Sequence, residues 1–263
     1  YRVEHGSTPA WHGFSVEGDG LYSDSFPSFD SVNDQNYYLE IFNRGEKKLS
    51  YSVQPLNEWI QLSKETGTIE FFDKIMVSIQ WDKVPKGISS GQIKILSNGQ
   101  EFKVEIPLNT ELPEIKGFTE NNGIVAIEAE NFMHNQDGDK VSWEVVPNLG
   151  RTGSSIVVNP MNVERQQPGE GTAMITYEFT TFEDEDLKVH TYLSPTQNYQ
   201  KTEGLKFAIG IDNEEPQVIN INEDEIKPDW EYADWWSKSV ADHIKKSIST
   251  HKNIEAGPHT LKV

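Results

Sequence analysis

The sequence predicts a mainly β protein with two β-sandwich domains and one helix late in the second domain. Short runs of alternating apolar and polar residues recur between turn residues at regular spacing. The pair Asn98-Gly99 separates two of these runs, which is a strong β-hairpin signal. A stretch with four Pro and Gly residues, 107–123, divides the series of strands in two.

Composition limits the classes of protein to which the chain can belong. Of its 263 residues 35% are hydrophobic, enough to build real cores, so general disorder is excluded. The net charge of −19 argues against nucleic acid and anionic membrane surfaces as partners. The absence of cysteine excludes disulfides, cysteine nucleophiles and cysteine-ligated zinc. No stretch approaches the ~18 apolar residues of a membrane span.

The first domain follows a segment without periodicity. Residues 1–35 are rich in Gly, Ser, Asp and Pro, so we expect an irregular tether there. Residues 36–110 then contain six or seven short strands, which predict an immunoglobulin-like β-sandwich.

The second domain, residues 111–263, contains a further series of strands and a change of period. Trp236, Val240, Ile244 and Ile248 recur every four residues, which predicts a helix that opens at Pro228-Asp229 and buries Trp236. Residues 258–263 have a strand pattern up to the last residue. We therefore expect the chain to be a piece of a longer protein, with any targeting signal upstream.

Glu128 and Glu130 are the main candidates for a metal site. Two carboxylates one residue apart on a strand, expected over 124–129, point to the same side and can approach one calcium ion. An exposed strand edge is the alternative. The acidic runs 183–186 and 223–225 fit solvated turns or cation sites.

Catalytic motifs are missing from the sequence, but three tryptophans, Trp143, Trp235 and Trp236, are candidates for sugar contact. The histidines lack the zinc spacing of a metalloprotease helix, and no Gly-x-Ser-x-Gly elbow, P-loop or Gly-x-Gly-x-x-Gly loop occurs. Aromatic faces can stack on the C–H face of a pyranose. Trp235 points away from the apolar stripe of the predicted helix and is the better candidate for such a contact.

Motifs in both domains occur in the order of a known family. In the first domain they are FPSFD at 26–30, Gln35, Tyr37, FNRG at 42–45, WIQLS at 59–63 and GTI at 67–69. In the second they are IEAENF at 127–132, WEVVPNLGRTGS at 143–154, YEF at 177–179, VHTYLSPT at 189–196, Ile211-Asp212 and HTLK at 259–262. Over residues 25–263 the chain thus resembles the C-terminal region of glycoside hydrolase family 115, the xylan α-1,2-glucuronidases.

The resemblance implies a parent with an α/β domain, a TIM-barrel catalytic domain, a helical bundle and C-terminal sandwiches. The last sandwich would be of the jelly-roll or galactose-binding type. The catalytic acid and base belong to the barrel, so no catalytic residue is expected here and the chain alone should be inactive. The first sandwich is also similar to carbohydrate-associated immunoglobulin-like modules. The second begins like carbohydrate-binding module families 6 and 35, in which glutamates matching Glu128 and Glu130 hold a structural calcium.

The resemblance also implies a function and partners. We expect an accessory region of an exported enzyme, secreted or periplasmic through its parent's signal, that removes glucuronic or 4-O-methylglucuronic acid from xylan. It would pack on the upstream catalytic domain, form a homodimer and contact xylan. The alternative is an autonomous carbohydrate-binding module. Residues 111–263 carry 13 basic and 27 acidic residues (13 − 27 = −14), so contact with a glucuronate-bearing chain requires a local cation, Arg151 or Arg165.

Overall fold

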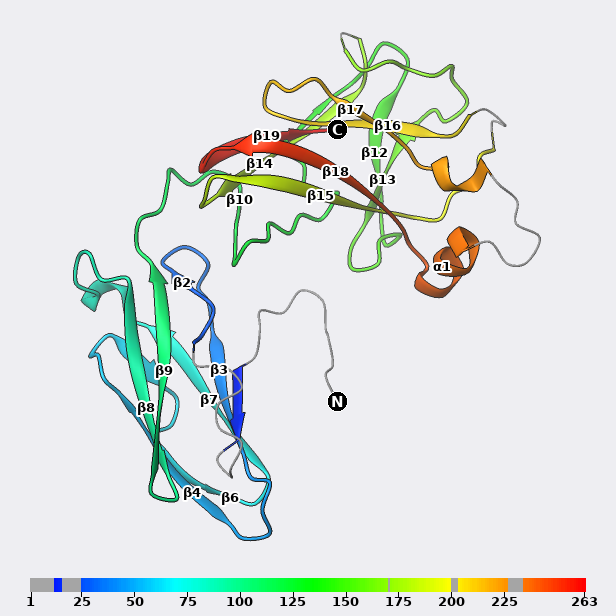
Figure 1. Ribbon diagram of the computed structural model, residues 1–263. Helices are drawn as coiled ribbons and strands as arrows, with labels where there is room; N and C mark the ends of the chain where they lie inside the picture. The colour runs from blue at the N-terminus through cyan, green and yellow to red at the C-terminus, as the bar shows by residue number, and fades with distance from the viewer. Residues whose placement is uncertain (1–11, 16–24, 170, 200–202, 227–233) are drawn as a thin grey trace. The chain divides into compact units, whose positions relative to one another are not determined.

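The computed structural model describes residues 12–15, 25–169, 171–199, 203–226 and 234–263 of the chain (Figure 1). It divides into two compact units, Tyr1–Leu112 and Pro113–Val263. Strands dominate both units, and the described part of the chain contains one α-helix. The prediction of a mainly β protein is therefore confirmed. Within the described ranges, no helix has the length and apolar character needed to cross a membrane.

Unit 1 consists of two sheets that enclose one apolar core. One sheet has the strand order β1-β3-β7-β5 and the other the order β2-β9-β8-β4-β6 (Figure 1). The strands are β1 (His12–Ser15), β2 (Phe29–Asp30), β3 (Tyr37–Phe42), β4 (Leu49–Pro55), β5 (Ile60–Leu62), β6 (Thr66–Ile69), β7 (Phe72–Ile79), β8 (Ser90–Ser97) and β9 (Gln100–Asn109). A short 3-10 helix, Trp81–Lys83, follows β7.

Alternation along the strands builds the core of unit 1. Leu39 and Ile41 of β3 point inward and are fully buried, as are Ile93 and Ile95 of β8. Each such side chain contributes roughly 1.5–3 kcal/mol of transfer free energy. The predicted hairpin is formed at Asn98-Gly99, where both residues have the positive φ angles, 47° and 76°, that join β8 to β9.

Two stretches of the segment 1–35, which was predicted to be irregular, are strands. β1 pairs in parallel with β3, and β2 pairs in parallel with β9. Both are too short to show a period, so the sequence pattern could not reveal them. Phe29 of β2 is buried, and its ring centroid lies 4.7 Å from that of Tyr37, so this part of the segment belongs to the core.

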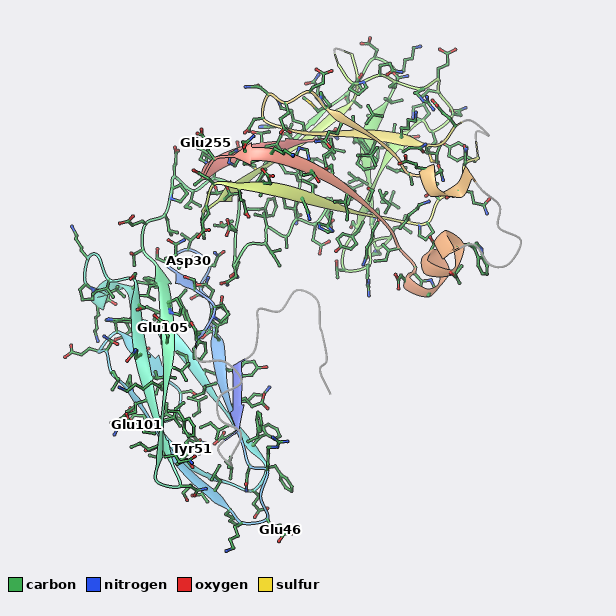
Figure 2. The ribbon with its side chains drawn as sticks, viewed as in Figure 1. Asp30, Glu46, Tyr51, Glu101, Glu105 and Glu255 are labelled. Carbon is green, nitrogen blue, oxygen red and sulfur yellow. The ribbon has the colours of Figure 1, made fainter. Side chains whose placement is uncertain are left out.

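Asp30, at the end of β2, is a buried carboxylate that fixes the following turn (Figure 2). Its Oδ1 accepts hydrogen bonds from the backbone amides of Val32 (2.9 Å) and Asn33 (2.8 Å). Its Oδ2 accepts from the side-chain amides of Asn33 (2.8 Å) and Gln35 (2.5 Å). Gln35 Oε1 in turn accepts from Asp30 N at 2.9 Å. The motif residues Asp30 and Gln35 therefore have a structural role.

Unit 2 is built around a sheet with the order β10-β14-β19-β16-β17, to which β11 adds beside β14. These strands are β10 (Phe118–Thr119), β11 (His134–Gln136), β14 (Met174–Thr181), β16 (Lys206–Ile211), β17 (Gln217–Asn220) and β19 (Gly257–Lys262). The last strand thus lies between β14 and β16, and Val263 exchanges two backbone hydrogen bonds with Ile175.

Two two-stranded ribbons complete unit 2. One pairs β12 (Ser142–Val146) with β13 (Ser155–Asn159), and the other pairs β15 (Glu185–Leu193) with β18 (Lys245–Ile254). Strand β18 of the second ribbon contacts β16 and β17. The core between these elements includes Phe179, Ile211 and Ile254, with Leu187 and Val189 of β15 packed against them.

The helix of unit 2, α1 (Asp234–Asp242), is shorter than predicted. His243 has a left-handed φ of 55°, typical of the residue that ends a helix. Residues 245–254 form β18, so the four-residue spacing that reaches Ile248 is a coincidence of strand and helix periods. Trp236 is 46% exposed, and the prediction that it is buried is wrong. The expected helix start at Pro228-Asp229 lies outside the described residues.

Candidate functional site

Glu128 and Glu130 lie in an irregular segment that ends in a turn, not on the predicted strand. The turn is closed by Asn131 N, which donates to the carbonyl of Glu128 at 3.0 Å. The strand prediction is wrong because Val125 and Ile127 are held by packing on the core of unit 2 rather than by a β-ladder. Strand alternation therefore does not explain where the two carboxylates lie.

The two carboxylates are instead organised by the loop between β12 and β13. Thr152 Oγ1 donates to Glu128 Oε1 at 2.6 Å, and the Ser154 amide donates to Glu130 Oε1 at 2.7 Å. A Cβ on Gly153 would lie only 2.3 Å from Glu130 Oε1, so any larger residue there would displace this carboxylate. Backbone hydrogen bonds, first from Ser154 and then from its own amide, lower the pKa of Glu130. The site thus holds a stable negative charge.

One oxygen of this site has no partner. Glu130 Oε2 is buried and makes no hydrogen bond. Nearby, Tyr177 is buried and donates its hydroxyl to the carbonyl of Ala129 at 2.7 Å. Burial and the charge of Glu130 raise the pKa of Tyr177, so its hydroxyl stays protonated. A buried, unpaired carboxylate oxygen is a suitable ligand for a hard cation.

The donor set of this site is incomplete for calcium if only acidic side chains are counted. Calcium takes six to eight oxygen ligands. In the ranges that the structure covers, no three His, Cys, Asp or Glu side chains are grouped so that they could hold a metal ion. Glu128 and Glu130 can supply carboxylate oxygens, and backbone carbonyls, hydroxyls or water would have to supply the others.

The two candidates for sugar contact have different positions in unit 2. Arg151 is exposed on the loop between β12 and β13, directly before Thr152, which binds Glu128. Three of the four predicted site residues therefore lie at or beside one loop. Trp235 belongs to α1, but its side chain lies outside the described residues.

A further constellation in unit 2 joins a serine, a histidine and a carboxylate. His251 Nδ1 lies 2.6 Å from Glu214 Oε2, and His251 Nε2 lies 2.8 Å from Ser249 Oγ. The order resembles that of an acid–base–nucleophile relay. However, Ser249 is only 5% exposed and the side chain of His251 is fully buried, so no substrate can reach them. We assign this network to the stability of unit 2.

Sequence reasoning missed this network because its members come from distant elements. Strand alternation places Ser249 and His251 on one face of β18, but nothing in the sequence marks Glu214, which follows β16.

The acidic run 183–186 also has long-range contacts. Asp184 and Asp186 accept the backbone amides of Ala256 and Asn253, at 2.7 and 3.0 Å, and so fix the turn between β18 and β19.

The fold and the site together define the class of the protein: it consists of two β-sandwich units, the second of which carries an acidic site beside the loop between β12 and β13. A family model described as "Glycosyl hydrolase family 115 C-terminal domain" matches residues 117–263, more than half of the chain and nearly all of unit 2. The chain therefore belongs to glycoside hydrolase family 115, as a C-terminal region of such a protein. No curated protein matches the chain.

Proposed function

We propose that the chain is the non-catalytic accessory region of an exported xylan α-1,2-glucuronidase. Its role is to pack on the upstream catalytic domain, to support dimerisation and to contact xylan, from which the parent removes glucuronic or 4-O-methylglucuronic acid. The family match supports the accessory role. One observation in unit 1 carries the packing role.

That observation is an exposed apolar face on the sheet β1-β3-β7-β5. Phe71 and Phe72 are 75% and 60% exposed, and Met76 is 38% exposed. Phe72 lies opposite Phe42 in the β3–β7 ladder, and Met76 lies opposite Tyr38. Side chains on the same face of paired strands are neighbours, so Phe72 with Phe42 and Met76 with Tyr38 form two apolar pairs on one face, with the charged pair Glu40 and Lys74 between them. Phe71 directly precedes β7 and adds a third exposed apolar side chain at this end of the sheet. Exposed apolar side chains rimmed by polar residues mark interaction sites in soluble proteins.

The upstream catalytic domain is the occupant that this face suits best. The first strand, β1, forms the edge of the same sheet beside β3. Polypeptide that precedes β1 in a parent protein is therefore connected to unit 1 at this sheet. A domain so tethered has a high effective concentration at the apolar face, which favours docking there.

The packing role can be tested with a double variant, Phe71→Ser with Phe72→Ser. We expect the wild-type chain to bind the separately produced catalytic region of its parent in sedimentation velocity, and the double variant to bind at least tenfold more weakly. The matched control is Val32→Ser with Leu56→Ser, two exposed apolar residues elsewhere in unit 1. Equal binding by wild type and double variant would contradict the packing role. Self-association of the wild type alone would assign the face to dimerisation.

A structural calcium at Glu128 and Glu130 is part of the proposal. Its support is the buried, unpartnered Glu130 Oε2 next to a second carboxylate. Calcium there would neutralise the charge of the loop and hold residues 152–154 in place.

A further inference from the structure

The ribbon β15–β18 of unit 2 has two chemically different faces. Alternation buries Ser249 and His251 and turns Leu187 and Val189 toward the core. The opposite face is exposed and comprises Lys188, His190 and Tyr192 of β15 with Lys246, Ile248, Thr250 and Lys252 of β18. We call these seven residues the ribbon face. Lys188 pairs with Thr250, His190 with Ile248 and Tyr192 with Lys246, so the face is continuous across both strands.

The charge of the ribbon face is opposite to that of its unit. It carries three lysines, whereas residues 111–263 carry 27 acidic and 13 basic residues. One carboxylate, Asp186, lies at the end of the face and accepts the amide of Asn253. Across the described residues, none of the three ammonium groups lies within ion-pair distance of a carboxylate. Three uncompensated cations on an acidic unit create a local positive potential.

An aromatic ring lies among these cations. Tyr192 is 60% exposed, and Lys246 Nζ lies 5.4 Å from its ring centroid. Lys246 lies over one face of this ring, so an apolar sugar face can stack on Tyr192 only where the lysine does not cover it. Lys246 and Lys252 are six residues apart on one strand, which corresponds to roughly 20 Å. A ligand that meets both lysines must therefore be a chain with several acidic groups, because a single sugar is too short.

We propose that the ribbon face binds a uronic-acid-bearing polysaccharide chain. Tyr192 stacks on a sugar ring, and Lys188, Lys246 and Lys252 bind carboxylates of the chain. The inference rests on the proposed function, because the family substrate supplies the class of glycan. It assigns xylan contact to these strands in addition to Arg151, and it removes the conflict between an acidic unit and an acidic substrate. An anionic protein surface is the competing occupant, but an exposed tyrosine flanked by lysines on a narrow ribbon suits an extended glycan better.

The test uses the full chain and two defined polymers. We expect calorimetry to show binding to 4-O-methylglucuronoxylan at low salt, and at least tenfold weaker binding to the same polymer after its carboxyl groups are reduced. Raising the salt concentration to 0.5 M should weaken binding several-fold, since the contacts are between exposed charges. The triple variant Lys188→Gln, Lys246→Gln, Lys252→Gln and the variant Tyr192→Ala should each lose at least tenfold in affinity.

The control is a triple variant in unit 1, Lys47→Gln, Lys83→Gln, Lys86→Gln, with the same change in net charge at three exposed positions. It should bind like the wild type, and all variants should keep the wild-type melting temperature within a few degrees. Equal affinity for both polymers, or full binding by the ribbon-face variants, would overturn the inference. The inference would also be overturned if the ribbon-face triple variant still bound the glycan but no longer bound the catalytic region. The ribbon face would then be a protein interface. Absence of glycan binding in a wild type that still binds the catalytic region would refute only this inference and leave the packing role intact.

Discussion

Replacing Asp30 by Asn is expected to destabilise unit 1 although the side chain keeps its shape. In the wild type, one carboxylate oxygen accepts from two backbone amides and the other from the amide groups of Asn33 and Gln35. An asparagine keeps an acceptor for the backbone amides but places an NH₂ group opposite two NH₂ donors. Gln35 cannot simply turn over, because its Oε1 already accepts from Asp30 N.

The magnitude follows from these four bonds. A hydrogen bond to a charged group contributes about 1.5–3 kcal/mol and a neutral one about 0.5–1.5 kcal/mol. Two bonds therefore weaken by about 1 kcal/mol each, and two are lost at a site that is only 3% exposed. With allowance for non-additivity, we expect a loss of about 3 kcal/mol in the free energy of unfolding of unit 1.

The assay is hydrogen exchange with mass spectrometry in increasing urea, because peptides report the two units separately. The control is Asp34→Asn in the same turn, an exposed residue whose left-handed φ of 47° asparagine adopts readily. That variant should change stability by less than ~0.5 kcal/mol. If Asp30→Asn is as stable as Asp34→Asn, the carboxylate does not fix this turn.

Three other predictions concern titration and calcium. Burial and the hydrogen bond to Asp73 raise the pKa of Tyr51, so stability that is fully present below pH ~10 falls as the pH rises further. The urea midpoint of the wild type should therefore decline from pH 9 to 11, and Tyr51→Phe should decline less. Equal declines in the two proteins would contradict this prediction. Arg165 and Lys206 lower the pKa of Glu203 from 4.5 to about 2, so the stabilisation present above pH 4.5 is lost as the pH falls toward 2. The urea midpoint of Glu203→Gln should therefore fall less between pH 5 and 2.5 than that of the wild type. An equal fall would show that these ion pairs do not stabilise the fold. Calcium should raise the melting temperature of the wild type and chelator should reverse the rise, whereas Glu130→Gln should respond little; an equal response would place the ion elsewhere.

The parts of the fold that local periodicity encodes were predictable. Leu39 and Ile41, or Ile93 and Ile95, alternate with polar or exposed neighbours, and the structure buries them fully. The hairpin at Asn98-Gly99 was equally predictable from the sequence, because its backbone angles are a property of those two residues. Such features depend on a few consecutive residues.

The remaining features depend on contacts between distant parts of the chain. The first four residues of β18 were predicted as helix because Ile248 happens to continue the spacing of Trp236 and Val240, and only the ladder with β15 makes them a strand. The partners of the predicted Glu128 and Glu130 lie 24 residues further along the chain. The spacing of the two glutamates drew attention to this loop, but it could not show that Glu130 has a buried oxygen without a partner.

The position of β19 determines when each unit can fold during synthesis. Unit 1 has all its strands once residue 109 has left the ribosome. The main sheet of unit 2 is different, because its third strand in spatial order is the last one to be made. Until residues 257–262 emerge, β14 and β16 have no strand between them, and each presents an open edge. A chain that lacks residues 257–262 would therefore keep unit 1 intact and leave unit 2 as a substrate for chaperones and proteases.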